Sequence, residues 1–350
     1  MKKIALVGCG RISKRHIQVL KQMPEMNLVS VCDVQEGRAQ AAAEPLGIHS
    51  YTDALEMVKR EQPDIVSVLT DSGLHPKLGC CLAPHVPALV VEKPMALTLD
   101  DADRLIETCE DHRCRLFVVK QNRFNPAIRM LKQALDQGRF GKLVLGTVRI
   151  RWARRQDYYD QDSWRGTWAM DGGVFTNQAS HHIDLLQWLM GPVESAKAYI
   201  ATRLAKIEAE DTGVGVLKFR NGALGVVEAT TATRPVDLEG SISILGEKGS
   251  VVVGGFSVNR MITWQFAEAA PEDEAAREAI TNPPNVYGFG HLPFYQDVLE
   301  CLATGRESML CGQEGRKSLE IINALYDSAI NGHEVRLQFR PEGIPLGRLA

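Results

Sequence analysis

The sequence predicts a two-domain protein: an α/β domain with a doubly wound sheet, followed by an α+β domain with a large open, mostly antiparallel sheet. Up to about residue 121, short apolar strands alternate with helical segments, which indicates a parallel sheet covered on both faces. From residue 142 the pattern changes to longer alternating strands without helices between them. A length of 350 residues also exceeds one ordinary core. We place the domains at residues 1–121 and 122–350.

Composition narrows the class of protein. Charged residues at 24% and hydrophobic residues at 45% are ordinary for a soluble globular chain, and a net charge of -3 gives no reason to expect nucleic-acid binding. The N-terminal apolar run is too short for a signal-peptide core, and no run approaches a membrane span. The eight cysteines form no C-x-x-C pair and are interpreted as reduced core thiols, which favours the cytoplasm.

The first strand, residues 3–7, leads directly into Gly8-Cys9-Gly10-Arg11-Ile12-Ser13. This is a dinucleotide fingerprint with serine in the third glycine position, followed by a helix from Ile12 to about Gln22. Gly8, Gly10, Arg11 and Ile12 are therefore predicted to cradle a pyrophosphate at the helix N-terminus. The second strand, Leu28–Cys32, ends in Asp33, which would accept hydrogen bonds from the adenosine ribose and repel a 2′-phosphate. The alternative for Asp33 is a turn-former. The pattern predicts a Rossmann domain that binds NAD rather than NADP.

The remaining elements of this domain bring three segments to the ligand edge of the sheet. The predicted strands are Asp64–Thr70, Ala88–Val91 and Arg115–Lys120, and the predicted helices are Pro76–Ala83 and Thr98–Cys109, the latter capped by Thr98. Ligands bind beyond the carboxyl ends of such strands. We therefore expect Thr70, His75 and Glu92 to line the cofactor site. Lys93, held extended before Pro94, is expected to project into the crevice, with an ordinary surface lysine as the alternative.

The second domain is expected to begin with a helix from residue 126 to about Gln137. Alternating segments then predict an open sheet of about six strands. Seven such segments are present, at Leu143–Trp152, Val193–Arg203, Thr212–Phe219, Leu224–Ala232, Gly240–Leu245, Ser250–Val253 and Met261–Phe266. In the first strand Thr147, Arg149 and Arg151 share one face, and Val148, Ile150 and Trp152 the other. Hairpin turns are predicted at Asn221-Gly222 and at residues 247–249.

A polar stripe is predicted on a helix of about four turns that begins at the glycine turn Asp171-Gly172-Gly173 and stops at Gly191-Pro192. On that helix Asn177, His181 and Asp184 would share one face. Such a stripe is costly to bury without a purpose, although a satisfied core histidine with a capping asparagine is the alternative.

The end of the chain gives weaker signals. Residues 267–285 are interpreted as an exposed insertion or lid, and the helices Gly290–Gly305 and Glu314–Asn331 are expected to return to the first domain. The tail from Arg340 has no periodicity and is expected to be loosely held or to lie across a neighbouring subunit. One face of the predicted sheet carries Val, Ile and Trp side chains, and the predicted helices are too few to cover it. This predicts a homo-oligomer, with a tetramer favoured over a dimer.

Four motifs together resemble the glucose–fructose oxidoreductase and inositol dehydrogenase (Gfo/Idh/MocA) family; they are the fingerprint at residues 8–13, E-K-P-M-A-L-T at 92–98, N-R-F-N-P at 122–126 and D-G-G…H-x-x-D at 171–184. The resemblance covers nearly the whole chain. It implies that Lys93 and His181 line the site where a sugar hydroxyl meets the nicotinamide. The family usually carries an aspartate four residues before the histidine. Here Asn177 stands in that place, so the role of base shifts to His181 and Asn177 would orient the sugar.

Finer similarity is to the UDP-N-acetylglucosaminuronate 3-dehydrogenases, which act in making the diacetamido-uronic acid sugars of bacterial lipopolysaccharide O-antigen. The resemblance implies oxidation of the C3 hydroxyl of that UDP-sugar, with Gln121, Asn122, Arg123, Arg165 and Asn177 contacting the substrate. A basic lining for its diphosphate and carboxylate is sought among Arg123, Arg149, Arg151, Arg154, Arg155 and Arg165. A solvated sheet face is the alternative for Arg149 and Arg151. Tyr158, Tyr159 and Tyr287 could stack on uracil or sugar, or simply pack on the surface.

Three other functions stay open. The same fold could oxidise a free polyol such as inositol or an unmodified sugar. The chain could be a non-catalytic sensor of NAD and a sugar, against which the presence of both Lys93 and His181 argues. A metal enzyme using His181, His182 and Asp184 is disfavoured, because adjacent histidines diverge on a helix and no His-x-x-x-His pair exists. We expect no metal.

Overall fold

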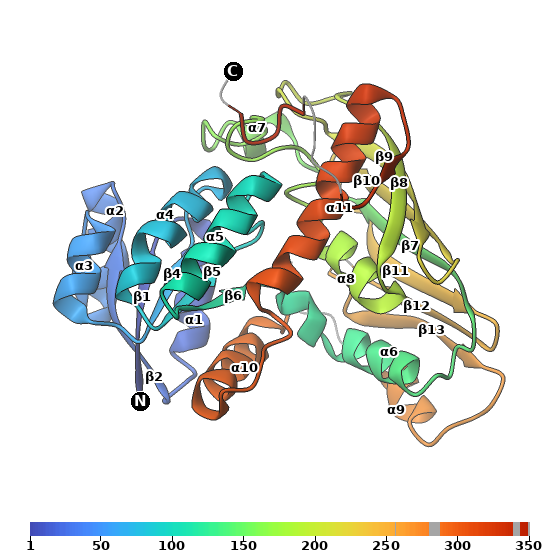
Figure 1. The fold of residues 1–350 in the computed structure, drawn as a ribbon, viewed down its shortest axis with the longest axis horizontal. Coiled ribbons are helices and arrows are strands. Elements are labelled where there is room, and N and C mark those ends of the chain that lie inside the picture. Colours follow the sequence, from blue (N-terminus) through green and yellow to red (C-terminus); the bar gives the residue numbers. More distant parts are fainter. Residues whose placement is uncertain (256, 280–287, 339–343, 349–350) are drawn as a thin grey trace. The chain divides into compact units, whose positions relative to one another are not determined.

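The computed structural model describes residues 1–255, 257–279, 288–338 and 344–348 (Figure 1). The chain divides into two compact units, and each is described by itself. The N-terminal unit comprises residues 1–119 and 291–316, and the C-terminal unit comprises residues 120–290 and 317–350. The predicted domain boundary after residue 121 lies two residues beyond this division.

The N-terminal unit is a six-stranded parallel sheet with the order β3-β2-β1-β4-β5-β6. Its strands are β1 (Lys2–Val7), β2 (Met26–Cys32), β3 (His49–Tyr51), β4 (Ile65–Val68), β5 (Ala88–Val91) and β6 (Arg115–Val118). Its helices are α1 (Arg11–Leu20), α2 (Glu36–Ala43), α3 (Ala54–Glu61), α4 (His75–Leu82), α5 (Leu99–Asp111) and α10 (His291–Thr304), with short 3-10 turns at Glu44–Leu46, Ser72–Leu74 and Ala83–His85. The order confirms the doubly wound prediction, with the switch between β1 and β4.

The local signals of this unit act as predicted. All four residues of β5 are buried, as a parallel strand covered on both faces requires. Thr98 caps α5, because its side chain accepts the N–H of Asp101 at 3.1 Å. Helices α2 and α3 and strand β3 were not predicted, because segments of three to eight residues are too short to show a clear period.

The C-terminal unit carries an eight-stranded sheet with the order β13-β12-β11-β7-β10-β9-β8-β14. The strands are β7 (Leu143–Arg151), β8 (Val193–Ala201), β9 (Thr212–Phe219), β10 (Leu224–Thr230), β11 (Glu239–Gly246), β12 (Gly249–Gly254), β13 (Arg260–Phe266) and β14 (Val335–Arg336). Neighbours are antiparallel except β7 and β10. All seven alternating segments are present, but the expected total of about six strands is wrong, partly because β14 spans only two residues.

The helices of this unit are η4 (Gln121–Phe124), α6 (Pro126–Asp136), α7 (Gln156–Tyr159), α8 (Ser180–Met190), α9 (Asp273–Glu278) and α11 (Gly312–Asn331), of which residues 312–316 belong to the N-terminal unit. Helix α8 lies against β7, where a Cβ on Gly146 would come within 2.7 Å of Leu186. Helix α11 lies against β9, where a Cβ on Gly215 would come within 2.5 Å of Leu325. Small residues in the strands therefore let the helices approach one face of the sheet.

This packing corrects the predicted uncovered face. Val148 and Ile150 are both 0% exposed, so the face that we expected to lie open is the covered one. The opposite face of the same sheet is exposed and carries the large hydrophobic residues Tyr199, Val214, Val216 and Leu224.

Three further expectations change. Helix α8 begins at Ser180, so Asn177 precedes the helix and does not share its face with His181 and Asp184. Within the segment 267–285, the described residues up to 279 are mostly exposed, as predicted, but they include α9, whose buried Asp273 pairs with Arg139 at 2.7 Å and ties the segment to the C-terminal unit; residues 280–285 lie outside the described part. Of the two C-terminal helices, α10 belongs to the N-terminal unit, whereas α11 from residue 317 belongs to the C-terminal unit.

The chain end is partly packed. Ile344 and Leu346 are 3% and 0% exposed, and the N–H of Gly347 donates to the carbonyl of Trp168 at 2.8 Å. These residues are thus held within the C-terminal unit, while 339–343 and 349–350 lie outside the described residues. None of the described helices is both long and apolar enough to cross a membrane.

Candidate active site

The fingerprint loop forms a tight turn between β1 and α1. Gly8 has a φ of 100°, and a Cβ there would come within 2.7 Å of the Leu69 backbone, so only glycine fits. A Cβ on Gly10 would meet no described atom within 4 Å. Ser13, in the third fingerprint position, is buried and donates to the carbonyl of Gly10 at 2.7 Å. The small hydroxyl thus ties the loop to the helix where many fingerprints carry glycine.

Asp33 follows β2 directly and lies beside this loop. Its carboxylate accepts the N–H of Cys9 at 2.9 Å and the N–H of Gln35 at 2.9 Å. Each carboxylate oxygen can accept a second hydrogen bond, so the group both holds the loop and can still receive ribose hydroxyls. Burial, followed by the charge of Asp33, raises the pKa of the Cys9 thiol to about 12, which keeps it a neutral thiol.

The segment after β5 is held from inside the N-terminal unit. Glu92 is 6% exposed; its Oε1 lies 3.1 Å from His16 Nε2, and its Oε2 accepts the N–H of Lys93 at 2.9 Å. Burial would raise the pKa of Glu92, but the hydrogen bond and charge of His16, with the charges of His291 and Lys93, lower it to about 2. Glu92 was expected to contact the cofactor. Both of its carboxylate oxygens contact other residues of the protein. The Lys93–Pro94 peptide bond is cis.

His75 bridges two of the predicted ligand-edge segments. It is 1% exposed, with Nδ1 at 2.8 Å from the Pro94 carbonyl oxygen and Nε2 at 2.9 Å from the Thr70 carbonyl oxygen. Burial lowers the pKa of His75, although the two carbonyls oppose that effect. Its ring thus links the residues after β4 to those after β5, and this position is internal to the fold.

The C-terminal unit positions His181 in the first turn of α8. Its Nε2 lies 3.1 Å from the side-chain nitrogen of Gln121, which belongs to η4 and is 5% exposed. Turned so that its buried oxygen, which has no hydrogen-bond partner among the described residues, faces Nε2, the Gln121 amide accepts the Nε2–H of a neutral ring, whose lone pair then lies on Nδ1. Gln121 therefore sets the orientation of the imidazole.

Arg123 is not placed for contact with substrate. It is 0% exposed and makes a bidentate ion pair with Asp184, with both N···O distances at 2.8 Å. Its guanidinium also lies 5.2 Å from the ring centroid of Trp188, and Lys120 adds a contact of 3.3 Å to Asp184. Burial would raise the pKa of Asp184, but the charges of Arg123 and Lys120 hold it below its ordinary value. Asp184 thus anchors α8 to η4 rather than orienting the imidazole.

The turn before α8 is built around Asp171. This carboxylate is 2% exposed and accepts the Asn177 amide at 2.5 Å and the N–H of Gly166 at 2.8 Å. Asn177 is half-buried and lies outside α8. Its amide nitrogen therefore faces Asp171.

A second buried acid, Glu210, supports the same turn. It is 1% exposed and accepts the N–H of Phe175 at 2.9 Å and the hydroxyl of Tyr326 at 2.8 Å. Gly173 passes so close that a Cβ would come within 2.1 Å of Glu210 Oε2. Burial raises the pKa of Glu210 to about 7. The role of Glu210 could not be predicted from the sequence, because its partners lie 35 and 116 positions away.

The candidate basic lining is mostly neutralised within the protein. Arg151 pairs with Glu228 at 2.6 Å on the exposed sheet face, and Arg149 lies 3.8 Å from the same carboxylate, which supports the solvated-face alternative. Arg154 pairs with Asp237 at 3.0 Å. Arg155 donates to the Pro235 carbonyl at 3.2 Å.

Arg165 pairs with Asp162 at 3.0 Å and lies over the rings of Tyr158 and Trp164, at 4.7 and 4.8 Å. Tyr158 receives a hydrogen bond from Arg165 at 2.9 Å, and Tyr159 is 6% exposed. Both tyrosines therefore pack within the protein, and Tyr287 lies outside the described residues.

The residues of helix α8 do not support the metal site that was considered for His181, His182 and Asp184. His182 is 1% exposed with its ring 5.9 Å from Trp152, and burial lowers its pKa to about 4, so it is a neutral core residue. Asp184 is engaged by Arg123. Among the described residues, one group of three has metal-ligand spacing, His16 with Glu92 and His291, and it lies in the N-terminal unit.

The features of the N-terminal unit fit a dinucleotide. The glycine turn, the open side of Gly10 and an α1 N-terminus without acidic residues suit a pyrophosphate, and Asp33 suits a ribose diol. The C-terminal unit, considered by itself, offers an imidazole held by Gln121, which suits a polar substrate with an exchangeable proton.

Comparison with known proteins agrees with this division. Residues 2–120 match the family described as oxidoreductase, NAD-binding Rossmann fold, and residues 132–337 match the family described as oxidoreductase, C-terminal alpha/beta domain. Curated relatives include a D-apiose dehydrogenase of Paraburkholderia graminis, 27% identical over 96% of this chain and 90% of that protein. A myo-inositol 2-dehydrogenase of Thermotoga maritima is 30% identical over 71% of this chain and 74% of that protein.

Two solved structures are more similar. The WlbA dehydrogenase from Bordetella pertussis, in complex with NADH and UDP-GlcNAcA, is 44% identical with a TM-score of 0.89 over 96% of this chain and 99% of that chain. The WlbA dehydrogenase from Chromobacterium violaceum, with the same two ligands, is 42% identical with a TM-score of 0.91 over 97% and 96% of the two chains. From its fingerprint, its two units and these matches, the chain belongs to the Gfo/Idh/MocA family of oxidoreductases, with an NAD-binding Rossmann domain.

Proposed function

We propose that this protein is an NAD-dependent dehydrogenase that oxidises the C3 hydroxyl of UDP-2-acetamido-2-deoxy-glucuronate to the 3-keto sugar. The observation that carries the proposal is similarity above 40% identity, over nearly the whole chain, to two dehydrogenases solved with NADH and UDP-GlcNAcA. The D-apiose and inositol dehydrogenases are less similar, at 27% and 30% identity. A free sugar or polyol is therefore the second candidate substrate.

The chain's own residues would divide the work between the two units. In the N-terminal unit, Gly8, Gly10 and the first N–H groups of α1, from Arg11 and Ile12, would hold the pyrophosphate, and Asp33 would hold the adenosine ribose. Thr70, His75 and Glu92 would shape the nicotinamide end, His75 and Glu92 through the backbone that they hold. Bound NAD⁺ supplies the hydride acceptor.

In the C-terminal unit, neutral His181 would take the proton of the C3 hydroxyl. A histidine has an ordinary pKa close to neutral pH, so it can act as a base without large tuning. Lys93, as an ammonium ion, would hydrogen-bond the same oxygen and stabilise the negative charge that develops on it. Asn177, which Asp171 holds through the amide nitrogen, would orient the sugar.

For the remaining substrate contacts we retain Arg165 and Asn122 and withdraw Arg123. Arg165 keeps a partly accessible guanidinium beside Tyr158, although Asp162 already neutralises part of its charge. Asn122 has a buried side-chain oxygen with no hydrogen-bond partner among the described residues. Gln121 would act through His181.

The test is formation of NADH from NAD⁺ with UDP-2-acetamido-2-deoxy-glucuronate, compared with UDP-N-acetylglucosamine, myo-inositol and D-apiose under the same conditions. We expect kcat/KM for the uronate to exceed that for each other compound by at least about a hundredfold, because charged groups are strongly discriminated. Faster turnover of a free polyol would favour the second candidate. Binding of NAD and sugar without turnover of any compound would favour a sensor.

The same proposal places the enzyme in the cytoplasm, where sugar nucleotides and NAD are available, in the synthesis of diacetamido-uronic acid sugars of lipopolysaccharide O-antigen. We also propose a homo-oligomer, with a tetramer favoured over a dimer. Support comes from Tyr199, Val214, Val216 and Leu224, which are 70%, 48%, 56% and 56% exposed on one face of the large sheet. A cluster of this kind is typical of a protein–protein interface.

A further inference from the structure

Lys93 lies between two residues that buried histidines of the N-terminal unit hold in place. On one side, His16 Nε2 lies 3.1 Å from Glu92 Oε1, and Glu92 Oε2 accepts the N–H of Lys93 at 2.9 Å. On the other side, His75 Nδ1 lies 2.8 Å from the carbonyl oxygen of Pro94. His16, His75 and Glu92 are 0%, 1% and 6% exposed, so solvent does not compete for these bonds.

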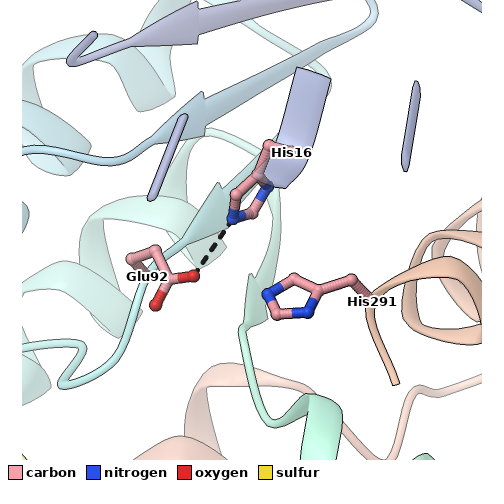
Figure 2. A group of neighbouring side chains, drawn as sticks. All are labelled: His16, Glu92 and His291. Carbon is pink, nitrogen blue, oxygen red and sulfur yellow. Dashed lines mark hydrogen bonds and ion pairs between the residues drawn. The ribbon is translucent and has the colours of Figure 1, made fainter. Parts of the chain in front are cut away.

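The first of these contacts belongs to a longer chain of side chains. His16 Nδ1 lies 2.6 Å from the hydroxyl of Tyr295, which in turn lies 3.0 Å from Ser67 Oγ. Figure 2 shows His16 extending from α1 to Glu92, with His291 beside them; the His16 and His291 rings meet edge-on at 5.4 Å. Nε2–H of His16 can donate to Glu92, and the Tyr295 hydroxyl, which can both donate and accept, can pair with Nδ1 in either state of the ring.

The contacts of His75 complete the frame. Both of its ring nitrogens face carbonyl oxygens, of Thr70 at 2.9 Å and of Pro94 at 2.8 Å; because carbonyls can only accept, a neutral ring donates to one of them and packs against the other, and a protonated ring donates to both. His75 therefore ties the backbone that follows β4 to the backbone that follows β5. Glu92 is thus held through His16 to helices α1 and α10, and Pro94 is held through His75 to the backbone after β4.

We propose that Tyr295, His16 and His75 are positioning residues for Lys93. They fix the backbone on both sides of the lysine and so hold its ammonium group at one place on the reacting oxygen. This inference rests on the proposed function in one respect, namely that Lys93 takes part in the reaction. A displacement of about 1 Å at a catalytic group can lower a rate on the order of a hundredfold.

A metal site is the competing account of the same cluster. His16, Glu92 and His291 offer ligand atoms within 4.8 Å of one another, and two histidines with a glutamate are a known zinc set. However, both nitrogens of His16 and both oxygens of Glu92 already have hydrogen-bond partners at 2.6 to 3.1 Å. A tetrahedral zinc would need ligand atoms roughly 3.4 Å apart and would replace the His16–Glu92 hydrogen bond. The geometry favours the hydrogen-bonded chain.

The test compares Tyr295→Phe and His16→Gln with Tyr51→Phe. The control removes a phenol that donates to Glu61 at 2.5 Å in the same unit, away from Lys93. With the UDP-uronate, Tyr295→Phe is expected to lower kcat at least about tenfold while KM and the Kd for NADH stay within about threefold. The primary deuterium isotope effect from substrate labelled at C3 should rise, because hydride transfer becomes slower than the other steps. Tyr51→Phe should change neither quantity.

A second measurement does not depend on turnover. Hydrogen exchange of the peptide that contains residues 93–97 should be faster in Tyr295→Phe, His16→Gln and His75→Gln than in the wild type, and unchanged in Tyr51→Phe. If Tyr295→Phe does not fold, Ser67→Ala removes the far end of the chain and should show a smaller change in the same direction. An inactive wild-type enzyme would refute the proposed function and leave this exchange test intact.

Two results would overturn the inference. One is an unchanged kcat, isotope effect and exchange rate in Tyr295→Phe and His16→Gln with an active wild-type enzyme. The other is one equivalent of zinc per chain in the purified protein, lost in His291→Ala, which would identify the cluster as a metal site.

Discussion

Asn177 and Asp171 show how one buried contact determines a residue type. The Asn177 amide donates to Asp171 at 2.5 Å, and Asp171 is 2% exposed. An aspartate at position 177 would bring two carboxyl groups within hydrogen-bond distance, and one of them would have to keep its proton. The asparagine that departs from the family pattern therefore has a local structural cause.

Replacing Asn177 by Asp should consequently make stability depend on pH. The shared proton raises the pKa of the carboxyl pair in the folded state, so the folded protein is favoured at low pH and loses stability as the pH rises through that pKa. We expect Asn177→Asp to be destabilised by about 1–3 kcal/mol at pH 8, with a smaller loss at pH 5, measured by denaturant unfolding. The control is Asn27→Asp on an exposed position of β2. An equal effect of the two substitutions at both pH values would contradict this account.

Single residues also mark the limit of prediction from sequence. Lys93, His181 and Asp33 could be proposed as site residues because each stands at a fixed distance from a recognisable turn or strand end. Arg123 could not be judged in the same way, because its partner Asp184 lies 61 positions away. A sequence shows that a charge exists, but it does not show whether another buried charge neutralises it.

At the scale of elements, helix α8 depends on a buried ion cluster. Asp184 receives Arg123 at two atoms and Lys120 at one, and all three side chains are at most 4% exposed. Replacing Asp184 by Asn would leave two buried cations without a counter-charge, and we expect a loss of about 3–5 kcal/mol in the free energy of unfolding. Denaturant unfolding measures it. The matched exposed pair is Glu56–Arg60 at 2.7 Å, and Glu56→Gln should cost at most about 1 kcal/mol. Similar losses in the two variants would show that the cluster is not the anchor of α8.

The turn that precedes α8 depends on Glu210, whose pKa burial raises to about 7. A carboxyl with a raised folded-state pKa contributes stability below its unfolded pKa and loses it as the pH rises through the folded value. We expect the free energy of unfolding to fall by up to about 3 kcal/mol between pH 4.5 and 7.5 through this group. Glu210→Gln, which carries no charge, should remove that part of the slope. A slope that is identical in the wild type and the variant would assign the pH dependence to other groups.

Elements differ in how well their patterns reveal them. Strands such as β9, with strict burial alternation over eight residues, match the prediction at both ends. The start of α8 did not, because residues 174–179 form a turn that Glu210 and Tyr326 stabilise from distant parts of the chain. Periodicity identifies regular elements, but it does not identify a turn whose support comes from tertiary contacts.

At the scale of the whole molecule, the exposed face of the large sheet is the feature that a single chain does not explain. Replacing Val216 by Lys puts a charge in the centre of this face, and we expect light scattering to show a shift from an oligomer to a smaller species. The matched control is Val34→Lys, at a position 88% exposed in the other unit. An unchanged molar mass in Val216→Lys would place the interface elsewhere.

The sequence predicted a two-sided sheet correctly but assigned the open side to the wrong face, because the number of covering helices is not visible in strand alternation.

The central claim is that Lys93 and His181 act on one sugar hydroxyl of a UDP-uronate. The most direct measurement is the rate of NADH formation from NAD⁺ and UDP-2-acetamido-2-deoxy-glucuronate by the wild type and by Lys93→Met, together with the Kd of each protein for NADH. We predict turnover by the wild type, a rate below about a tenth of it in Lys93→Met, and nearly equal affinity for NADH. A Lys93→Met enzyme that keeps more than about a tenth of the wild-type rate would contradict the account.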